Sequence, residues 1–223
     1  MIGRTLVISG GVVDIGFAEE YLSWQKFDMV VCADAGLDSA CRLGLPVHYA
    51  MGDFDSVSKD VLASYQREKK QGIRTEFTPY PPEKDATDTH IVLDWVVKKQ
   101  PEEIVILGAT GKRLDHFLAN VHILMQPLSQ GIPTYMVDKH NKLYLLDHDY
   151  LLKREELFGK YISLIPFTEK VTGVCLRGFR YGLENGTLTS GDSLGVSNEL
   201  LEGEESASIS LQEGILIVVE SRD

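Results

Sequence analysis

The sequence predicts an α/β protein, with a mostly parallel sheet flanked by helices over residues 1–140 and an all-β sandwich domain over residues 141–223. Two observations support this prediction. In the first part, short apolar runs alternate with amphipathic stretches, which is the pattern of βαβ units. From about Leu143 onward the segments are short, β-branched or alternating, and Gly, Asn and Asp separate them, as in an antiparallel sandwich or barrel. The polar stretch 138–141 is the expected junction.

The first strands and helices of the α/β part follow in chain order. Residues 6–8 and 29–33 are continuous apolar runs, typical of strands that are buried on both faces of a parallel sheet. Residues 37–43 and 60–71 predict helices, and residues 73–77 predict a further strand. These elements form the first βαβ units of the expected sheet.

The same alternation continues to the end of the α/β part. Residues 87–99 predict a helix, and the very apolar residues 103–107 predict a strand. Residues 115–129 predict another helix, and residues 133–137 the strand after it. Apolar side chains are spaced for one buried face on that last helix, namely Leu118, Val121, Leu124 and Met125.

The all-β part is predicted from shorter signals. Residues 161–165 and 171–176 predict strands, and residues 214–220 are the most obvious strand of the chain. Turn signals at residues 184–186 (Glu-Asn-Gly) and 190–192 (Ser-Gly-Asp) recur at the spacing expected of antiparallel strands.

Length and composition predict a folded protein. The chain has 223 residues, of which 43% are hydrophobic and 25% are charged, so a disulfide-stapled mini-protein and wholesale disorder are excluded. Cys32, Cys41 and Cys175 have neither CxxC nor His-paired spacing. We therefore expect buried thiols rather than a disulfide framework or a zinc site.

The charge balance argues against two classes of partner. Asp and Glu number 33 against 22 Lys and Arg, which gives a formal net charge of −11. Such a chain is not expected to bind nucleic acid or an anionic membrane, whereas small polar or cationic ligands stay open. No apolar run approaches the roughly 20 residues that span a bilayer, and no signal peptide is evident, so we expect a cytoplasmic protein.

Two loops follow the first two predicted strands, where open α/β sheets bind ligands. Ser9, Gly10 and Gly11 come directly after the first strand. Paired glycines let the backbone approach a phosphate and turn its amides toward it, and an ordinary tight turn is the alternative. Asp34 ends the second strand, where its carboxylate can accept from a ribose hydroxyl, hold a metal-bound water or cap the following helix.

An Asp-x-Asp pair, Asp53 and Asp55, stands beside Gly52 in a predicted loop. Carboxylate oxygens suit Mg²⁺, which takes one or two of them and completes its shell with water and substrate phosphates. The chain lacks the long loop and terminal Glu of a calcium EF-hand here. An exposed acidic turn is the alternative to a metal site.

A second acidic pair lies at the start of the helix predicted from Thr87. Asp85 can cap this helix and Asp88 can complement its dipole. The same carboxylates can add to a metal site while Lys84 neutralises phosphate. Capping and catalysis therefore do not exclude one another.

The loop before the last predicted helix combines small and basic residues. A helix N-terminus follows the glycines and the basic pair of this loop, namely Gly108, Gly111, Lys112 and Arg113. Such a combination can bind a phosphate, although the spacing is not that of a Walker A loop. His116, in the first turn of the helix, is expected to be structural. No serine lies in a GxSxG elbow, so covalent nucleophilic catalysis has little support.

Taken together and in order, four segments resemble the motifs of the thiamine pyrophosphokinase family: GDFDS, KDATD, GATGKRLDH and GVSNE. The resemblance spans both parts of the chain. It implies transfer of a pyrophosphoryl group from ATP to the hydroxyl of thiamine, with Mg²⁺, to give AMP and thiamine diphosphate. It also implies a homodimer with thiamine at the subunit interface.

The resemblance implies roles for the matched residues. It implies four metal-binding carboxylates and an arginine that grips the transferred phosphates, and these catalytic residues are Asp53, Asp55, Asp85, Asp88 and Arg113. Residues that match the nucleotide-binding loops of the family are Ser9, Gly10, Gly11 and Asp34. Further residues inside matching motifs that contact the co-substrate are Thr87, Lys112 and Asp115.

The resemblance also implies a thiamine site in the second part. Ser197 and Asn198 match an SN signature, and the amide of Asn198 suits an aminopyrimidine edge, a β-turn being the alternative. Tyr181 falls near an aromatic that stacks on thiamine in relatives, and core packing is the alternative. One departure concerns the loop after the second strand, where the family commonly reads ADGG: here Ala35 replaces a glycine and must avoid positive φ.

Two other functions stay open at this point. A Mg²⁺-dependent phosphohydrolase would use the same acids to activate water, and it would release its nucleotide product without an alcohol acceptor. A nucleotide-sensing or structural dimer, with acidic loops that only cap helices, would bind ATP without regard to Mg²⁺ or not bind it.

Overall fold

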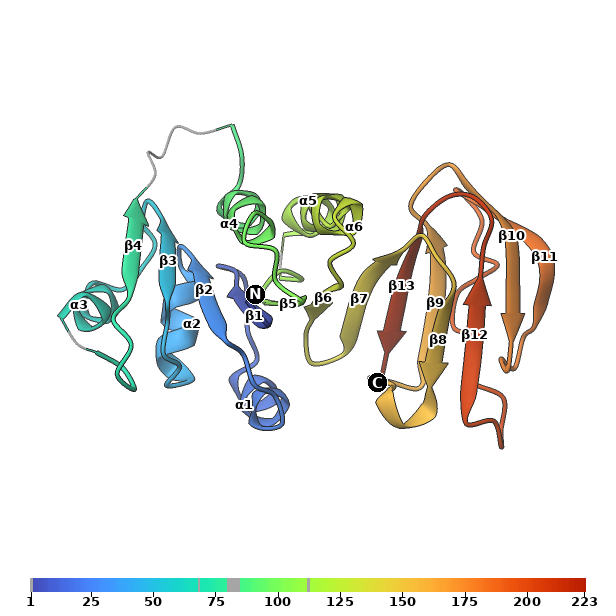
Figure 1. The fold of residues 1–223 in the computed structure, drawn as a ribbon, viewed down its shortest axis with the longest axis horizontal. Helices are drawn as coiled ribbons and strands as arrows, with labels where there is room; N and C mark the ends of the chain where they lie inside the picture. The colour runs from blue at the N-terminus through green and yellow to red at the C-terminus, as the bar shows by residue number, and fades with distance from the viewer. Residues whose placement is uncertain (1, 68, 80–84, 112) are drawn as a thin grey trace. The chain divides into compact units, whose positions relative to one another are not determined.

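Among the residues that the computed structural model describes (2–67, 69–79, 85–111 and 113–223), six parallel strands form the sheet of the first unit. The chain divides into two compact units: the first unit is Met1–Lys139 and the second unit is His140–Asp223. The strand order in the first is β4-β3-β2-β1-β5-β6 (Figure 1). The strands are β1 (Arg4–Ile8), β2 (Met29–Ala33), β3 (Tyr49–Gly52), β4 (Glu76–Pro79), β5 (Glu103–Leu107) and β6 (Thr134–Val137).

Helices cover both faces of this sheet. Figure 1 shows α4, α5 and α6 on one face and α1 and α2 on the other. The helices are α1 (Ile15–Ser23), α2 (Gly36–Arg42), α3 (Lys59–Arg67), α4 (Asp88–Val97), α5 (Leu114–Ile123) and α6 (Met125–Ser129). The part of the chain that the structure describes contains no helix long and apolar enough to cross a membrane.

Burial on both faces explains why the central strands are continuous apolar runs. Every residue of β2 is buried, and Leu6 of β1 and Ile104 of β5 are fully inaccessible. Gly36, the first residue of α2, lies so close to β1 that a Cβ atom there would collide with the carbonyl of Ile8. The α/β architecture predicted for the first part is confirmed.

The three cysteines are free thiols, but they are not equally buried. Cys32, the next-to-last residue of β2, is fully inaccessible, and burial raises the pKa of its thiol well above the usual range. Cys41 and Cys175 are only half-buried. The expectation of buried thiols therefore holds in full for Cys32 alone.

Two elements of the first unit were not predicted, and two others have different bounds from those predicted. Neither α1 nor β3 has a long periodic pattern, since α1 is nine residues long and β3 only four. The predicted helix over 60–71 ends at Arg67, and the strand predicted over 73–77 begins only at Glu76. Gln71 and Gly72 both have positive φ and form a tight turn that pairs Lys70 with Ile73, which excludes helix and strand there.

The helix predicted over 115–129 is two helices. Pro127 has no N–H to donate to the carbonyl of Ile123, and the helix is interrupted at Leu124. Val121 and Leu124 are buried as predicted, Met125 is half-buried, and Leu118 is 57% exposed, so the expectation for Leu118 was wrong. Asn120 lies on the buried face of α5, and residues two positions apart on a helix point about 200° apart. Leu118 therefore points away from the buried face.

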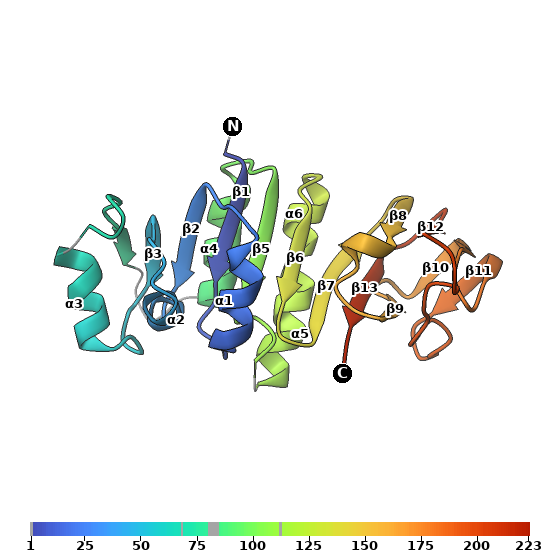
Figure 2. The same ribbon diagram turned by 90° about the horizontal axis from the view of Figure 1, so that it is seen from below.

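The second unit consists of antiparallel strands, as predicted. Strands β7, β13 and β9 pair in this order, and β11, β10, β12 and β8 form a separate sheet. Alternate residues of β13 are buried, and the core includes Ile162, Leu164, Val171, Val174 and Ile209. The strands are β7 (Asn141–Leu146), β8 (Tyr150–Lys153), β9 (Tyr161–Pro166), β10 (Lys170–Arg177), β11 (Leu183–Thr189), β12 (Ser206–Ser210) and β13 (Leu216–Ser221). Figure 2 shows the same strands from below.

One predicted turn lies inside a strand. Residues 184–186 belong to β11, where Asn185 has a φ of 48° and the register with β10 shifts on either side of the Val174–Gly186 pair. The Asn-Gly dipeptide therefore forms a β-bulge rather than a hairpin turn. The turn predicted at residues 190–192 is confirmed, since the amide of Asp192 donates to the carbonyl of Thr189.

Candidate active site

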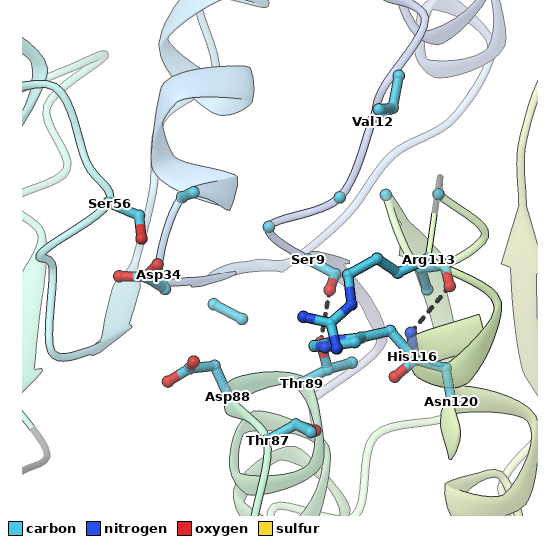
Figure 3. Close-up of a pocket in the computed structure, with 17 residues that line it drawn as sticks. Ser9, Val12, Asp34, Ser56, Thr87, Asp88, Thr89, Arg113, His116 and Asn120 are labelled. Carbon is cyan, nitrogen blue, oxygen red and sulfur yellow. Dashed lines mark hydrogen bonds between the residues drawn. The ribbon is translucent and has the colours of Figure 1, made fainter. Parts of the chain in front are cut away.

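A pocket of about 540 Å³ opens at the carboxyl ends of β1, β2 and β5 and at the first turns of α4 and α5 (Figure 3). All of its lining residues belong to the first unit. Figure 3 shows Asp34, Ser56 and Asp88 on one side and Arg113 on the other. The pocket is thus acidic on one side and basic on the other, at the edge where open α/β sheets bind ligands.

The loop after β1 is held against the loop after β5. The amide of Ser9 donates to the carbonyl of Leu107 (2.8 Å), and that of Gly11 donates to the carbonyl of Gly108 (3.0 Å). A Cβ atom on Gly11 would collide with that carbonyl. Gly11 therefore allows the two loop backbones to approach each other closely. The sequence suggested that its amide could bind a phosphate, but that amide is already bonded to Gly108.

The first turn of α4 supplies hydroxyl groups to the pocket. Thr87 caps the helix, because its side chain accepts a hydrogen bond from the amide of His90 (3.3 Å). The hydroxyls of Ser9 and Thr89 are 2.5 Å apart and buried. Ser9, Gly10, Gly11 and Thr87, which the resemblance assigns to the nucleotide, all line the pocket.

Three aspartates converge at the acidic side. Asp34, Asp53 and Asp55 each offer a carboxylate oxygen, and these atoms lie within 4.8 Å of one another. The amide of Asp34 donates to the carbonyl of Met51 (2.9 Å), and its Oδ1 accepts from the amide of Phe54 (3.0 Å). The loops after β2 and β3 are thereby joined into one structure.

The backbone of Asp34 explains the departure from the glycine-rich motif. Asp34 itself takes the positive φ, at 43°, whereas Ala35 has a helical φ of −58°. Ala35 therefore avoids positive φ, as its Cβ requires, and Asp tolerates that conformation better than most residues do.

The electrostatics of the cluster favour a bound cation. Burial, together with the charges of Asp88 and Asp53, raises the pKa of the Asp34 carboxyl above its ordinary value. Clustered carboxylates of this kind are stabilised by a hard divalent cation, and an all-oxygen donor set is the one that Mg²⁺ prefers. The residues present therefore fit Mg²⁺.

The predicted metal ligands are brought together only in part. Asp53 and Asp55 are in the cluster, and the third member is Asp34, which the sequence assigned to the nucleotide. Asp88 lines the pocket and is close enough for its charge to act on Asp34. Among the described residues, Asp85 is exposed and is neither in the cluster nor in the pocket lining.

Arg113 and Asp115 form the basic side. The guanidinium of Arg113 donates from Nε to Oδ1 of Asp115 (3.1 Å) and from a terminal nitrogen to Oδ2 (2.5 Å). These bonds lower the pKa of Asp115 to about 2, and they raise that of Arg113. Asp115 therefore positions Arg113 instead of facing the pocket itself, and Lys112 lies outside the described residues.

Four polar residues of the pocket were missed in the sequence: Ser56, Thr89, His116 and Asn120. His116 was assigned a structural role, yet it lines the pocket from the first turn of α5. His116 lies three positions after Arg113, and residues three or seven positions apart lie on the same face of a helix. This spacing could have placed His116 beside Arg113 in the site. Asn120 lies seven positions after Arg113, and Ser56 directly follows the Asp-x-Asp pair.

The residues assigned to thiamine lie in the second unit. Tyr181 is 61% exposed, and the guanidinium of Arg180 lies 5.6 Å from the centre of its ring. Asn198 is buried, and its side chain both donates to the carbonyl (2.8 Å) and accepts from the amide (3.0 Å) of Tyr181. Ser197 has a φ of 58°, and its amide donates to the hydroxyl of Ser163. Asn198 thus fixes the backbone that presents Tyr181.

Comparisons with known proteins agree across the chain. A family model described as thiamin pyrophosphokinase, catalytic domain, matches residues 21–136, and one described as thiamin pyrophosphokinase, vitamin B1 binding domain, matches residues 148–216. The thiamine pyrophosphokinase of Bacillus subtilis (strain 168) is 34% identical over 225 residues, covering 97% of this chain and 98% of the relative. Thiamin pyrophosphokinase 1 of Caenorhabditis elegans is 24% identical over 188 residues, covering 79% and 73%.

Solved structures show the same likeness. The crystal structure of the Bacillus subtilis thiamine pyrophosphokinase superposes with a TM-score of 0.85 at 29% identity, covering 99% of both chains. That of the Geobacillus thermodenitrificans thiamin pyrophosphokinase superposes with a TM-score of 0.81 at 31% identity, covering 99% of this chain and 98% of the other.

Proposed function

The chain belongs to the thiamine pyrophosphokinase family and is an enzyme of that activity, and from this premise we propose that its first unit binds ATP with Mg²⁺ in the described pocket. The reaction transfers the pyrophosphoryl group of ATP to the hydroxyl of thiamine and gives thiamine diphosphate and AMP. The observation that carries the assignment of the pocket is the acidic cluster of Asp34, Asp53 and Asp55, of which Asp34 lines the pocket together with Arg113.

Each side of the pocket has a task in this reaction. Asp34, Asp53 and Asp55 would hold Mg²⁺, which when bound neutralises phosphate charge. Arg113 attracts the transferred phosphates, and the positive end of the α4 helix dipole favours the same charge. Asp85 and Asp88 stay predicted metal ligands from the sequence, and we add Asp34 to the proposed set.

The chemical step is an in-line displacement. The oxygen of the thiamine hydroxyl forms a bond to the β-phosphorus, the bond from that phosphorus to the bridging oxygen of the α-phosphate breaks, and AMP leaves with the electron pair. The hydroxyl proton goes to a base. Asp115 is a poor base because its pKa is about 2, so its part is to orient Arg113.

We also propose that the second unit binds thiamine. The exposed ring of Tyr181 favours stacking on the heteroaromatic cation over core packing. Because the amide of Asn198 bonds to the backbone of Tyr181, Asn198 acts by positioning that ring. Ser197, the homodimer with thiamine at its interface and the cytoplasmic location stay predictions from the sequence.

A product assay tests the proposal. Purified protein is incubated with ATP, Mg²⁺ and thiamine, with controls that lack thiamine or metal, and the nucleotides and thiamine esters are separated. We expect AMP and thiamine diphosphate in equal amounts, and neither without Mg²⁺. ADP with thiamine monophosphate would move the attack to the γ-phosphorus, and nucleotide turnover without thiamine would favour the phosphohydrolase.

A further inference from the structure

Two buried hydroxyl groups of the pocket share a single hydrogen bond. Oγ of Ser9, from the loop after β1, and Oγ1 of Thr89, from the first turn of α4, are 2.5 Å apart (Figure 3). Both residues line the pocket, although Ser9 is only 4% exposed and Thr89 only 7%. The amide of Ser9 donates to the carbonyl of Leu107, and Thr87 caps the helix two residues before Thr89. The fold therefore holds both oxygens in place.

The bond between these oxygens uses only one of the two hydroxyl protons. Either oxygen can be the donor, and the oxygen that accepts keeps a proton of its own. Within the part of the chain that the structure describes, neither hydroxyl makes a second hydrogen bond. Buried polar groups are almost always paired, because an unmade bond costs the desolvation of the group. Whichever hydroxyl donates to the other, the pair offers one O–H donor to a group that enters the pocket.

The surroundings of the pair favour an anionic acceptor. Thr89 is the second residue of α4, close to the positive end of the helix dipole, and Arg113 lines the same pocket. Figure 3 shows the carboxylate of Asp88 turned toward the acidic side and away from the pair. An ionised phosphoryl oxygen carries no proton and can only accept a hydrogen bond. Such an oxygen therefore complements a single O–H donor beside a cationic side chain.

We propose that the pair of Ser9 and Thr89 donates a hydrogen bond to a non-bridging phosphoryl oxygen of the bound nucleotide. The inference rests on the proposed function, because it assigns one wall of the pocket in which ATP is proposed to react. One hydroxyl touches the phosphate, and the other orients it. Thr89 thereby joins Arg113 as a residue that positions the phosphate chain.

Nucleotide binding to Thr89→Val tests the proposal, because this substitution exchanges the hydroxyl for a methyl group of similar size. The dissociation constants of ATP, ADP and AMP are measured with Mg²⁺ by calorimetry. We expect ATP to bind roughly 10- to 100-fold more weakly, and Thr89→Ser to restore most of the affinity. The shortest nucleotide that shows the loss identifies the phosphate: AMP the α-, ADP the β- and ATP the γ-phosphate. Unchanged ATP affinity in both Thr89→Val and Ser9→Ala would overturn the proposal.

Thr134→Val is the matched control. Thr134 of β6 is also 7% exposed, and its hydroxyl donates to the carbonyl of Ile132 (3.2 Å). Of the described residues that line the pocket, none comes from β6. This variant should leave all three dissociation constants unchanged. An equal loss in the control would attribute the effect to stability and overturn the proposal.

A sugar series separates a phosphate contact from a ribose contact. Thr89→Val should weaken 2′-deoxy-ATP and 3′-deoxy-ATP by the same factor as ATP, because the phosphates are identical. If the substitution weakened ATP but not one of the deoxynucleotides, the hydroxyl would hold the ribose, and the proposal would be overturned.

The double variant Ser9→Ala/Thr89→Val tests whether the two hydroxyls act as one donor. It should bind ATP no more weakly than the weaker single variant, because only one hydroxyl touches the phosphate. Losses that multiply would mean two independent contacts and would contradict the single shared donor. Ser9→Ala also decides the question if Thr89→Val does not fold.

The two levels of the inference can fail separately. If ATP supports no thiamine-dependent AMP formation, the proposed function fails, and the binding series with Mg²⁺ still decides the role of the pair. If AMP forms normally and the single variants bind ATP as the wild type does, only the inference about the hydroxyl pair fails.

Discussion

At the scale of the residue, Asp34 combines a demanding backbone with an unfavourable charge. It takes a φ of 43°, and its carboxylate lies among those of Asp53, Asp55 and Asp88. Such local cost at a ligand site is typical of residues kept for function. The carboxylate that lowers the stability of the cation-free protein is therefore one that a cation would need.

Replacing Asp34 by asparagine should stabilise the metal-free protein. Asn keeps the Oδ1 that accepts from Phe54 and tolerates the positive φ, but it carries no charge. The pKa of Asp34 is higher in the folded state than its unfolded value of about 3.8, so protonated Asp34 stabilises the folded state relative to ionised Asp34. This contribution to the free energy of unfolding is complete below pH 3.8 and is lost as the pH rises through the folded pKa. Urea unfolding at pH 7 should therefore show a higher midpoint for Asp34→Asn.

Two controls accompany this prediction. Near pH 3 the gain should shrink, since Asp34 is then mostly protonated in both states. Mg²⁺ should raise the midpoint of the wild-type protein more than that of Asp34→Asn. A lower midpoint for the variant at pH 7 would contradict the electrostatic account.

Asp55 is the member of the cluster with the fewest structural duties. It is exposed, and its carboxylate accepts only from the neighbouring Ser56 hydroxyl among the described contacts. Asp55→Asn should therefore lower kcat by roughly 10²-fold or more through a weaker metal site, with little effect on the free energy of unfolding. The matched control is Asp60→Asn, since Asp60 is an exposed aspartate on α3, and activity of Asp55→Asn within a few-fold of the wild type would refute the metal role.

At the scale of the element, contact between backbones decides which glycines are replaceable. A Cβ atom on Gly36 would collide with the Ile8 carbonyl of β1, whereas one on Gly16, in the first turn of α1, meets only the carboxylate of Asp14 at 3.7 Å. Gly36→Ala should destabilise the protein by about 1–3 kcal/mol. Gly16→Ala should stabilise it by about 0.5–1 kcal/mol through helix propensity. Chemical denaturation of both variants checks the pair, and equal effects would contradict it.

Elements with a long periodic pattern could be predicted from the sequence, and those defined by local backbone geometry could not. The apolar runs of β2 and β5 predict buried strands because both faces of a parallel sheet are covered. The positive φ angles at Gln71 and Gly72, which shorten the third helix, leave no such pattern. At Asn185 the turn signal was real, but strand pairing converted it into a bulge.

The residues of the candidate site that belong to contiguous motifs could be predicted from the sequence. The residues that only tertiary contacts bring together were missed or given another role. The Asp53–Asp55 pair and Arg113 are visible in the sequence. The meeting of Asp34 with that pair depends on β2 and β3 being neighbours in the sheet, and β3 was not predicted. Asn120 escaped because an asparagine amid apolar residues looks like surface until its helix is placed.

At the scale of the whole molecule, each of the two units has its own family match. The catalytic-domain model falls within Met1–Lys139 and the vitamin B1 binding model within His140–Asp223. Each unit is compact by itself and carries its own core. The proposed division of labour between nucleotide and thiamine therefore follows the division of the fold.

Hydrogen exchange should report that division. Mg²⁺-ATP without thiamine should slow exchange at short labelling times at the loops after β1 and β5 and at the first turns of α4 and α5, because these segments line the pocket. The amides of β10 and β12 should be unchanged. Mass spectrometry of peptides measures both regions at once, with Mg²⁺ alone as the control, and equal protection of β10 and β12 would argue against nucleotide binding confined to the first unit.

The thiol of Cys32 supplies a chemical clock for the catalytic unit. It is the next-to-last residue of β2, where it pairs with β1 on one side and β3 on the other, and it is both inaccessible and held in the unreactive protonated form. An alkylating reagent can modify it only while the parallel sheet is open, so the labelling rate of its peptide counts opening events. Cys41 and Cys175, half-buried on other elements, supply the reference for reagent access. The alkylation rate of Cys32 therefore measures how often the parallel sheet of the first unit opens.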